Sequence, residues 1–487
     1  MFKARTHLSN SIFLTIRFFS VTLFNLLFTK YAIASLGYEK YGHFVLVASF
    51  LVSLQFLNTV IISVSSRYLS VVQNKGKRDI KKEFSNVFDL HLIIALASLI
   101  IGLVISNNFL NIENDIDDVN INALSFLYFG SLVSVFLNIL STPFQALLIA
   151  NTSFLAKSLV ESLHAVFKFL SIIIILPSID NFSSLCYLFP AFTAISPLLF
   201  VLAAVLFHKN QILIKLKFNL NSIIDRVKFS FWTSFGAFNF MLKTQFLVLI
   251  AYYFYGPKYG AISAITNQVF FAVWSLVGIF NQAIQPSLTK SSYKGINFDV
   301  LSMMNLNFRS IFILSIFILQ SYLFYSHYVF DIWLGVDFPK IILQITSLVI
   351  VSVIFESSIL SSHTIVNAKG VIRNYQLILS SPLLFILILC IIFFDGFISL
   401  YYALAINSVL VFSLALIYLK KNLQIPLNKF IKLKYDELVF NIILLSIIVA
   451  SFTFDIPIIL KIMITIFSSI LLIKLLIRNS VNLNKIS

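Results

Sequence analysis

The sequence is poor in charge, glycine, proline and cysteine. Only 11% of its 487 residues are charged, whereas 59% are hydrophobic. Soluble domains carry about a quarter charged residues, so this composition excludes a soluble protein and indicates a polytopic membrane protein. The two cysteines, Cys186 and Cys390, lie far apart in apolar runs. They form neither a disulfide pattern nor a metal-binding spacing.

Enzyme motifs are also missing. The sequence has no P-loop, so we expect no ATP hydrolysis within this chain. It has no His, Cys, Asp or Glu cluster with metal-ligand spacing, so we expect neither a metal nor another cofactor. The stretches between its apolar runs are short, which leaves no room for a catalytic domain in water. We therefore expect a protein that is not an enzyme.

Negative charge is scarce, and the net charge is +16. The basic residues gather in the short segments 67–83, 208–228 and 420–434, whereas 107–122 carries only acidic charges. Lys and Arg in short loops mark the cytoplasmic side of a membrane protein. The bias therefore predicts that both termini are cytoplasmic, and it does not indicate a nucleic-acid partner.

The first apolar run resembles a signal peptide in two respects, because Lys3 and Arg5 precede it and Ala32-Ile33-Ala34 mimics a cleavage site. The apolar core of a signal peptide has about 7–15 residues. This run is longer and contains Arg17, so we interpret it as an uncleaved first span.

Long apolar runs predict 14 transmembrane helices, each about 20 residues or slightly longer. The predicted spans are 11–36, 42–66, 87–106, 121–150, 155–177, 182–207, 229–254, 260–284, 308–330, 340–366, 371–394, 397–419, 437–453 and 456–477.

A short polar turn recurs in the two halves of the chain. Gly37-Tyr38-Glu39-Lys40-Tyr41-Gly42 and Gly256-Pro257-Lys258-Tyr259-Gly260 each follow the first helix of a half. This parallel repeat predicts two six-helix lobes around a central cavity. We place the lobes at residues 1–228 and 229–436, followed by an additional helix pair at 437–487.

A few charged and titratable side chains lie inside the predicted spans. A charge at the bilayer centre costs roughly 2.5–3.5 kcal/mol on insertion scales, so such residues are candidates for function. The cations are Arg17, Lys168 and Lys243, the anions are Glu161 and Glu356, and the histidines are His164 and His363. The repeat makes the helices of Arg17 and Lys243 equivalent, so we expect both cations to face one cavity that receives an anion such as a pyrophosphate.

Polar residues form stripes at helical spacing on otherwise apolar helices, and such stripes face a bundle interior or water. The stripes are Glu161, His164 and Lys168; Ser352, Glu356, His363 and Asn367; Ser134, Asn138, Thr142 and Gln145; and Asn267, Trp274 and Asn281.

Structural explanations of the same residues remain open. Glu161 and Lys168 could form an ion pair, Arg17 could snorkel towards the cytoplasm, and Glu356 could be the buried partner of a cation. The histidines could make ordinary helix contacts, and the Ser and Asn stripes could hold helices together.

Three short segments resemble a known family. They are Leu36-Gly37-Tyr38-Glu39-Lys40-Tyr41-Gly42 between two helices, Asp331-Ile332-Trp333-Leu334-Gly335, and Asn367-Ala368-Lys369-Gly370. Together they resemble polysaccharide biosynthesis proteins of the O-antigen flippase type, which belong to the multidrug/oligosaccharidyl-lipid/polysaccharide exporter superfamily. The resemblance covers roughly residues 8–420.

The resemblance implies a flippase of the bacterial inner membrane. Its substrate would be an undecaprenyl-pyrophosphate-linked oligosaccharide, an O-antigen or capsule repeat unit that moves to the periplasmic leaflet by alternating access. Its partners would be membrane lipids and the glycan polymerase and chain-length regulator of the same pathway. Arg17, Lys168 and Lys243 would then receive the pyrophosphate, with Glu161, Glu356, His164 and His363 as counter-charges or ion-coupling groups.

Two other functions compete with the flippase. A cation- or proton-coupled multidrug antiporter of the same superfamily should place acidic residues in its cavity, where cations dominate here. A membrane glycan polymerase usually needs a large outer loop, and the longest predicted outer segment, 107–122, is short and acidic. The sequence therefore favours a flippase.

Overall fold

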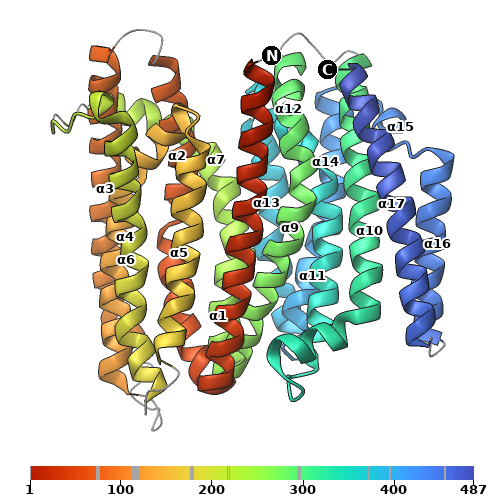
Figure 1. Ribbon diagram of the computed structural model, residues 1–487, viewed down its shortest axis with the longest axis horizontal. Helices are drawn as coiled ribbons and strands as arrows, with labels where there is room; N and C mark the ends of the chain where they lie inside the picture. Colours follow the sequence, from red (N-terminus) through yellow and green to blue (C-terminus); the bar gives the residue numbers. More distant parts are fainter. Residues whose placement is uncertain are drawn as a thin grey trace. The chain divides into compact units, whose positions relative to one another are not determined.

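The computed structural model describes residues 2–72, 77–111, 120–175, 180–216, 218, 220–292, 298–370, 372–393, 396–453 and 457–486. Within these ranges every regular element is a helix (Figure 1). The helices are α1 (Phe2–Leu54), α2 (Phe56–Val72), α3 (Lys77–Asn111), α4 (Ile121–Ala150), α5 (Phe154–Ile175), α6 (Asn181–His208), η1 (Lys209–Gln211), α7 (Leu220–Met241), η2 (Leu242–Phe246), α8 (Leu247–Tyr255), α9 (Pro257–Ser292), α10 (Phe298–Leu334), α11 (Ile341–Ser358), α12 (Leu360–Lys369), α13 (Ile372–Phe393), α14 (Ser399–Asn422), α15 (Leu427–Phe430), α16 (Tyr435–Thr453) and α17 (Ile458–Ile486).

The all-α polytopic membrane fold predicted from the sequence is confirmed. Among the described residues, 12 helices are long and apolar enough to cross a membrane. The second predicted span is not separate among these 12, because it begins inside α1 after Gly37 and continues as α2. The span predicted at 437–453 corresponds to α16.

The chain forms two compact units, Met1–Ile265 and Thr266–Ser487, which divide within α9. This division lies beyond the lobe boundary that the repeat predicts at residue 228, because α7 and α8 pack against α1, α2 and α3. The lobe limits 1–228, 229–436 and 437–487 therefore stay a prediction from repeat symmetry.

In the first unit, α4 packs along α6, and α1 packs along α5. The helices of the α4–α6 pair come close because small residues line their contact. A Cβ added at Gly130 would lie 2.9 Å from the Pro190 side chain. Ser134 Oγ donates to the Pro190 carbonyl over 3.0 Å, which gives this buried carbonyl a partner across the helix contact.

The segment between α6 and α7 is bound to α3 rather than looping freely. Ser85 Oγ donates to the Lys215 carbonyl (2.5 Å) and accepts from the Lys215 amide (3.3 Å). The Phe218 amide donates to Asp89 Oδ2 over 2.9 Å. Near the start of α7, Arg226 is buried, pairs with Glu83 at 2.5 Å and covers the Tyr68 ring. This connection therefore belongs physically to the first unit.

The two glycine-bounded turns have the same backbone geometry. Gly37 has φ 73° and ψ 176°, and Gly256 has φ 96° and ψ 173°. Both conformations favour glycine, and each lets a new helix start at a sharp angle. The two turns also touch, since a Cβ added at Gly42 would overlap the Pro257 carbonyl group. The repeated sequence thus corresponds to a repeated structure.

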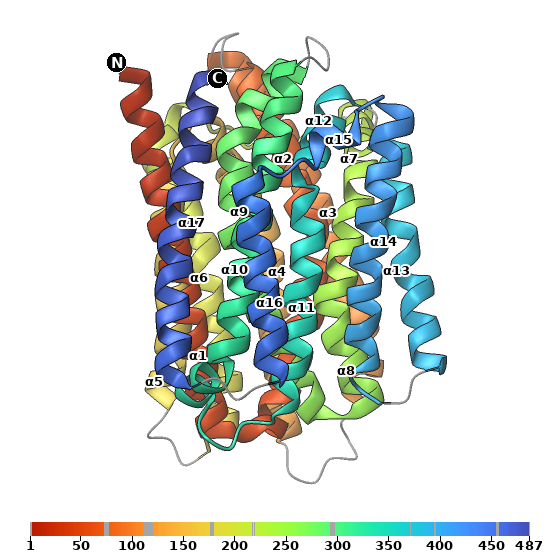
Figure 2. The same cartoon turned by 90° about the vertical axis from the view of Figure 1, so that its right-hand side faces the viewer.

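The second unit contains α10 to α17, in which α16 and α17 run beside α10 (Figure 2). A buried ionic network fixes this pair. Arg309 of α10 donates through Nε and Nη2 to Glu437 of α16, and Nη2 also donates to Asn479 Oδ1 of α17 at 3.0 Å. Arg478 of α17 binds both Glu437 and Asp436. The C-terminal helices are therefore an integral part of this unit.

Candidate functional site

Five of the seven predicted site residues lie in the first unit. Arg17 is on α1, Glu161, His164 and Lys168 are on α5, and Lys243 is in η2. The other two, Glu356 and His363, lie in the second unit on α11 and α12. The structure brings the α1 and α5 residues together, so we describe them first.

Arg17 and Glu161 form an ion pair between α1 and α5. Lys157 Nζ, one helical turn before Glu161, lies 3.9 Å from the other carboxylate oxygen. The glutamate therefore has a cation on each side, and neither is Lys168, the partner that the structural explanation proposed. Lys157 was not among the predicted site residues, because it lies close to the predicted start of its span.

Further along the same two helices, Lys168 Nζ donates to Asn25 Oδ1 at 3.1 Å. Its ammonium lies 4.9 Å from the ring centre of Phe28 and 5.9 Å from that of Phe189, so two aromatic faces stabilise the charge. Within the described part of the chain, no carboxylate lies within ion-pair distance of Lys168. His164 Nδ1 is buried there without a hydrogen-bond partner.

We call Arg17, Asn25, Lys157, Glu161, His164 and Lys168 the α1–α5 seam. Its residues on α5 follow each other at spacings of three or four and so share one side of the helix. The side chains of Leu159 and Leu163, which are 55% and 44% exposed, lie on roughly the opposite side. On α1, exposed Ile16, Phe19 and Leu23 likewise lie away from Arg17.

Both side chains of the Arg17–Glu161 pair are nevertheless partly exposed, although the Glu161 Oε2 atom itself is buried. The exposed fraction is 36% for the Arg17 side chain and 22% for Glu161. Charge facing hydrocarbon is costly, and the apolar faces of both helices point elsewhere. The accessible side of the seam therefore suits water or a polar ligand rather than lipid.

Lys243 lies in a π-helical turn, η2, that interrupts the helix between α7 and α8. Its Nζ is 5.8 Å from the centre of the Phe240 ring, and Thr244 Oγ1 donates to the Phe240 carbonyl at 2.9 Å. The widened turn packs against α1. Single π-helical turns are rare and often occur at functional sites, and no local sequence signal predicts this one.

Glu356 is buried near the end of α11. The stripe predicted on an unbroken helix 340–366 is interrupted, because α11 ends at Ser358 and α12 begins at Leu360. Glu356 and His363 therefore lie on two helices separated by Ile359 within the single span Ile341–Lys369, and their shared face stays a prediction. The His363 ring makes an edge-to-face contact with Tyr375 at 5.2 Å, as an ordinary helix contact would.

Other polar stripes connect helices. Thr142 Oγ1 of α4 donates to Asn58 Oδ1 of α2 at 2.7 Å. Asn307 Nδ2 of α10 donates to Asn281 Oδ1 of α9 at 3.0 Å, within the second unit. These contacts match the structural explanation, in which polar side chains join helices within apolar surroundings.

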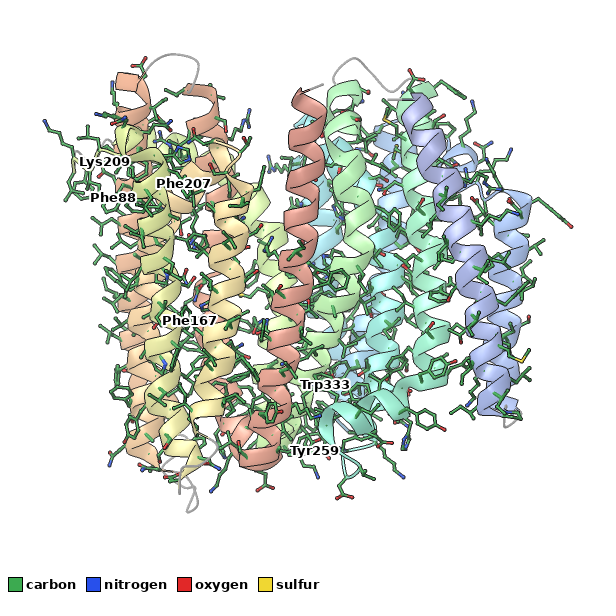
Figure 3. All side chains as sticks on the ribbon, viewed as in Figure 1. Phe88, Phe167, Phe207, Lys209, Tyr259 and Trp333 are labelled. Carbon is green, nitrogen blue, oxygen red and sulfur yellow. The ribbon has the colours of Figure 1, made fainter. Side chains whose placement is uncertain are left out.

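The basic segment after α6 and the second glycine-bounded turn lie far apart in the first unit. Figure 3 shows Lys209, at the start of the basic segment after α6, and Tyr259, in the second glycine-bounded turn, at opposite ends of this unit. No group of three or more His, Cys, Asp or Glu residues that could hold a metal ion occurs among the described residues.

Neither protein-family models nor curated protein sequences match this chain. Solved structures do. The structure of "Lipid II flippase MurJ, inward closed conformation" has a TM-score of 0.71 at 16% identity and covers 97% of this chain and 100% of that chain. An inward-facing "multidrug resistance MATE family transporter of the MOP superfamily" has a TM-score of 0.69 at 12% identity, covering 83% of this chain and 94% of that chain.

A third similar structure is that of the "MATE multidrug transporter DinF-BH", with a TM-score of 0.62 at 15% identity, covering 88% of this chain and 97% of that chain. At these identities the comparisons establish the fold, which this chain shares with MurJ and the MATE transporters.

Proposed function

We propose that this protein is a flippase that moves an undecaprenyl-pyrophosphate-linked oligosaccharide, such as an O-antigen or capsule repeat unit, from the cytoplasmic to the periplasmic leaflet by alternating access. The observation that carries the proposal is the cationic excess of the α1–α5 seam, within a fold shared along 97% of the chain with a lipid II flippase. The protein would act in the bacterial inner membrane with both termini in the cytoplasm.

The charge of the seam supports an anionic substrate. The seam contains three cations, Arg17, Lys157 and Lys168, and a single carboxylate, that of Glu161. A pyrophosphate offers the oxygens that an Arg binds with two parallel donors and that a Lys binds as a point charge. Lys243, on the neighbouring π-helical turn, would add a fourth cation. These residues would receive the head group, and Glu356 would serve as a counter-charge in the second unit.

The C-terminal helix pair supports a substrate with a lipid tail. Along α17, the side chains of Met463, Phe467 and Ile470 are 61–63% exposed. The lipid II flippase match covers 97% of this chain, so it extends into this helix pair. This exposed apolar surface would accommodate a polyprenyl chain while the sugars cross in water.

Multidrug antiport is the second candidate, because the MATE structures share the fold. In that function a carboxylate should be available for a cation. Here Glu161 lies between Arg17 and Lys157, which favours an anionic substrate instead. A glycan polymerase is disfavoured for want of a large outer loop, and the polymerase and chain-length regulator of the pathway remain proposed partners.

Replacing Lys243 by Ala tests the proposal. We expect loss of surface glycan while the protein remains in the membrane, measured by glycan staining and by immunoblotting of the membrane fraction. Lys461→Ala is the matched control, because Lys461 lies near the end of its span, against the Phe324 ring. We expect this variant to show normal surface glycan.

Purified protein in proteoliposomes gives the decisive comparison. We expect it to move a lipid-linked oligosaccharide to the opposite leaflet. Transport of a cationic dye without movement of the lipid-linked sugar would replace the flippase by the antiporter. Normal surface glycan in Lys243→Ala cells would remove Lys243 from the mechanism.

A further inference from the structure

We propose that Glu161 is a built-in substitute for the phosphate of the substrate: it occupies Arg17 and Lys157 in the empty protein, is displaced when a pyrophosphate binds, and then takes up one proton. This inference rests on the proposed function and adds to it how binding is coupled to protons. It starts from the geometry of the ion pair, in which one carboxylate lies between two cations of different helices.

The Arg17–Glu161 pair differs in exposure from the structural ion pair of Arg309 and Glu437. Arg309 and Glu437 form an equally direct pair, but their side chains are only 4% and 0% exposed, and Asn479 satisfies a further donor of Arg309. The Arg17–Glu161 pair is 36% and 22% exposed. A ligand can therefore reach the seam and compete for its cations, whereas Arg309 and Glu437 are inaccessible.

Competition between anions is the expected chemistry at such a site. A pyrophosphate and a carboxylate both bind Arg and Lys through oxygen atoms, and two anions repel each other at short distance. When the substrate takes Arg17 and Lys157, Glu161 loses both partners beside a doubly charged ligand. A carboxylate in that position favours its neutral form, so it binds a proton from water and becomes a carboxylic acid.

Few other titratable side chains lie near enough to Glu161 to take up the proton in its place when substrate binds. On α5 itself, Lys157, His164 and Lys168 share the side of Glu161. On α1, the charged residues after Arg17 are Lys30, Glu39, Lys40 and His43, all more than three turns away along the helix. Within the described residues of α4 and α6, which also pack on α5, the only titratable side chain besides Tyr and Cys is that of His208 at the end of α6. His164 is therefore the competing proton acceptor to test.

The experiment measures the dissociation constant of undecaprenyl pyrophosphate carrying one sugar, for the full-length protein in nanodiscs over a range of pH. The diester pyrophosphate keeps its charge throughout the titration. Uptake of one proton on binding makes the dissociation constant rise about tenfold per pH unit while the free carboxylate is charged. We expect that slope for the wild-type protein and for Glu39→Gln, which removes an exposed carboxylate from the same unit.

Glu161→Gln should bind more tightly than the wild-type protein at high pH and show no slope, because an amide neither competes as an anion nor takes up a proton. His164→Gln should keep the wild-type slope. A slope that persists in Glu161→Gln, or weaker binding by this variant at high pH, overturns the inference. Absence of binding by the wild-type protein at every pH contradicts the proposed function instead.

Discussion

Replacing Glu437 by Gln tests whether the C-terminal helix pair is held by its buried ionic network. The carboxylate is fully buried and binds Arg309, Arg478 and the Lys434 amide. The variant leaves Arg309, which is 4% exposed, without its counter-charge. Removing one partner of a buried pair costs about 3–5 kcal/mol, so we expect a clearly lower apparent unfolding temperature in detergent.

Asp436 offers a matched control one residue away. Its carboxylate pairs with Arg478 but is 47% exposed, and exposed pairs contribute about 0–1 kcal/mol. Asp436→Asn should therefore change the unfolding temperature little. The double variant Arg309→Met with Glu437→Leu should recover much of the loss, because an apolar pair avoids burying an unpaired charge.

Hydrogen exchange localises the effect. In Glu437→Gln, amides of α16 should exchange faster than in the wild-type protein, while amides of α4 should keep their protection. If Glu437→Gln is no more destabilising than Asp436→Asn, or if α16 keeps its protection, then the network does not hold the helix pair and our reasoning about its burial is wrong.

Two further predictions concern the contact between the turns and the topology. Gly42→Ala should destabilise the protein by about 1–3 kcal/mol through overpacking, because the new Cβ would overlap the Pro257 carbonyl group. Gly278→Ala, on a helix with nothing within 4 Å of the new Cβ, should instead be neutral or stabilising, and equal unfolding temperatures would refute the close contact. A cysteine inserted after Asp117, a position outside the described residues, should react with an impermeant thiol reagent in intact cells, whereas labelling only after lysis would reverse the proposed topology.

The sequence was sufficient to predict the helices, because the length of an apolar run directly reflects the thickness of the bilayer. The repeat of Gly37 and Gly256 was equally informative, since a backbone with positive φ needs glycine at both positions. Both inferences use local properties of the chain. They required no knowledge of which helices pack together.

The partners of the charged residues could not be predicted in this way. Helical spacing placed Glu161 and Lys168 on one side of a helix, but the structure pairs Glu161 with Arg17 across two helices. Arg309 lies next to the predicted start of its span. A basic residue is expected there from the positive-inside rule alone, so the sequence did not indicate that Arg309 is buried against Glu437. The break between α11 and α12 contains neither Pro nor Gly, the residues that usually announce one.

The binding of the α6–α7 connection to α3 has a mechanical consequence. The connection is hydrogen-bonded to Ser85 and Asp89 of α3, so it cannot extend while these bonds persist. α7 therefore cannot move away from α3 unless these hydrogen bonds break. Bending within the first unit can instead occur at the π-helical turn Leu242–Phe246, which interrupts the helix between α7 and α8. For the same reason, a protein divided into two co-expressed fragments should be cut elsewhere than at 212–218.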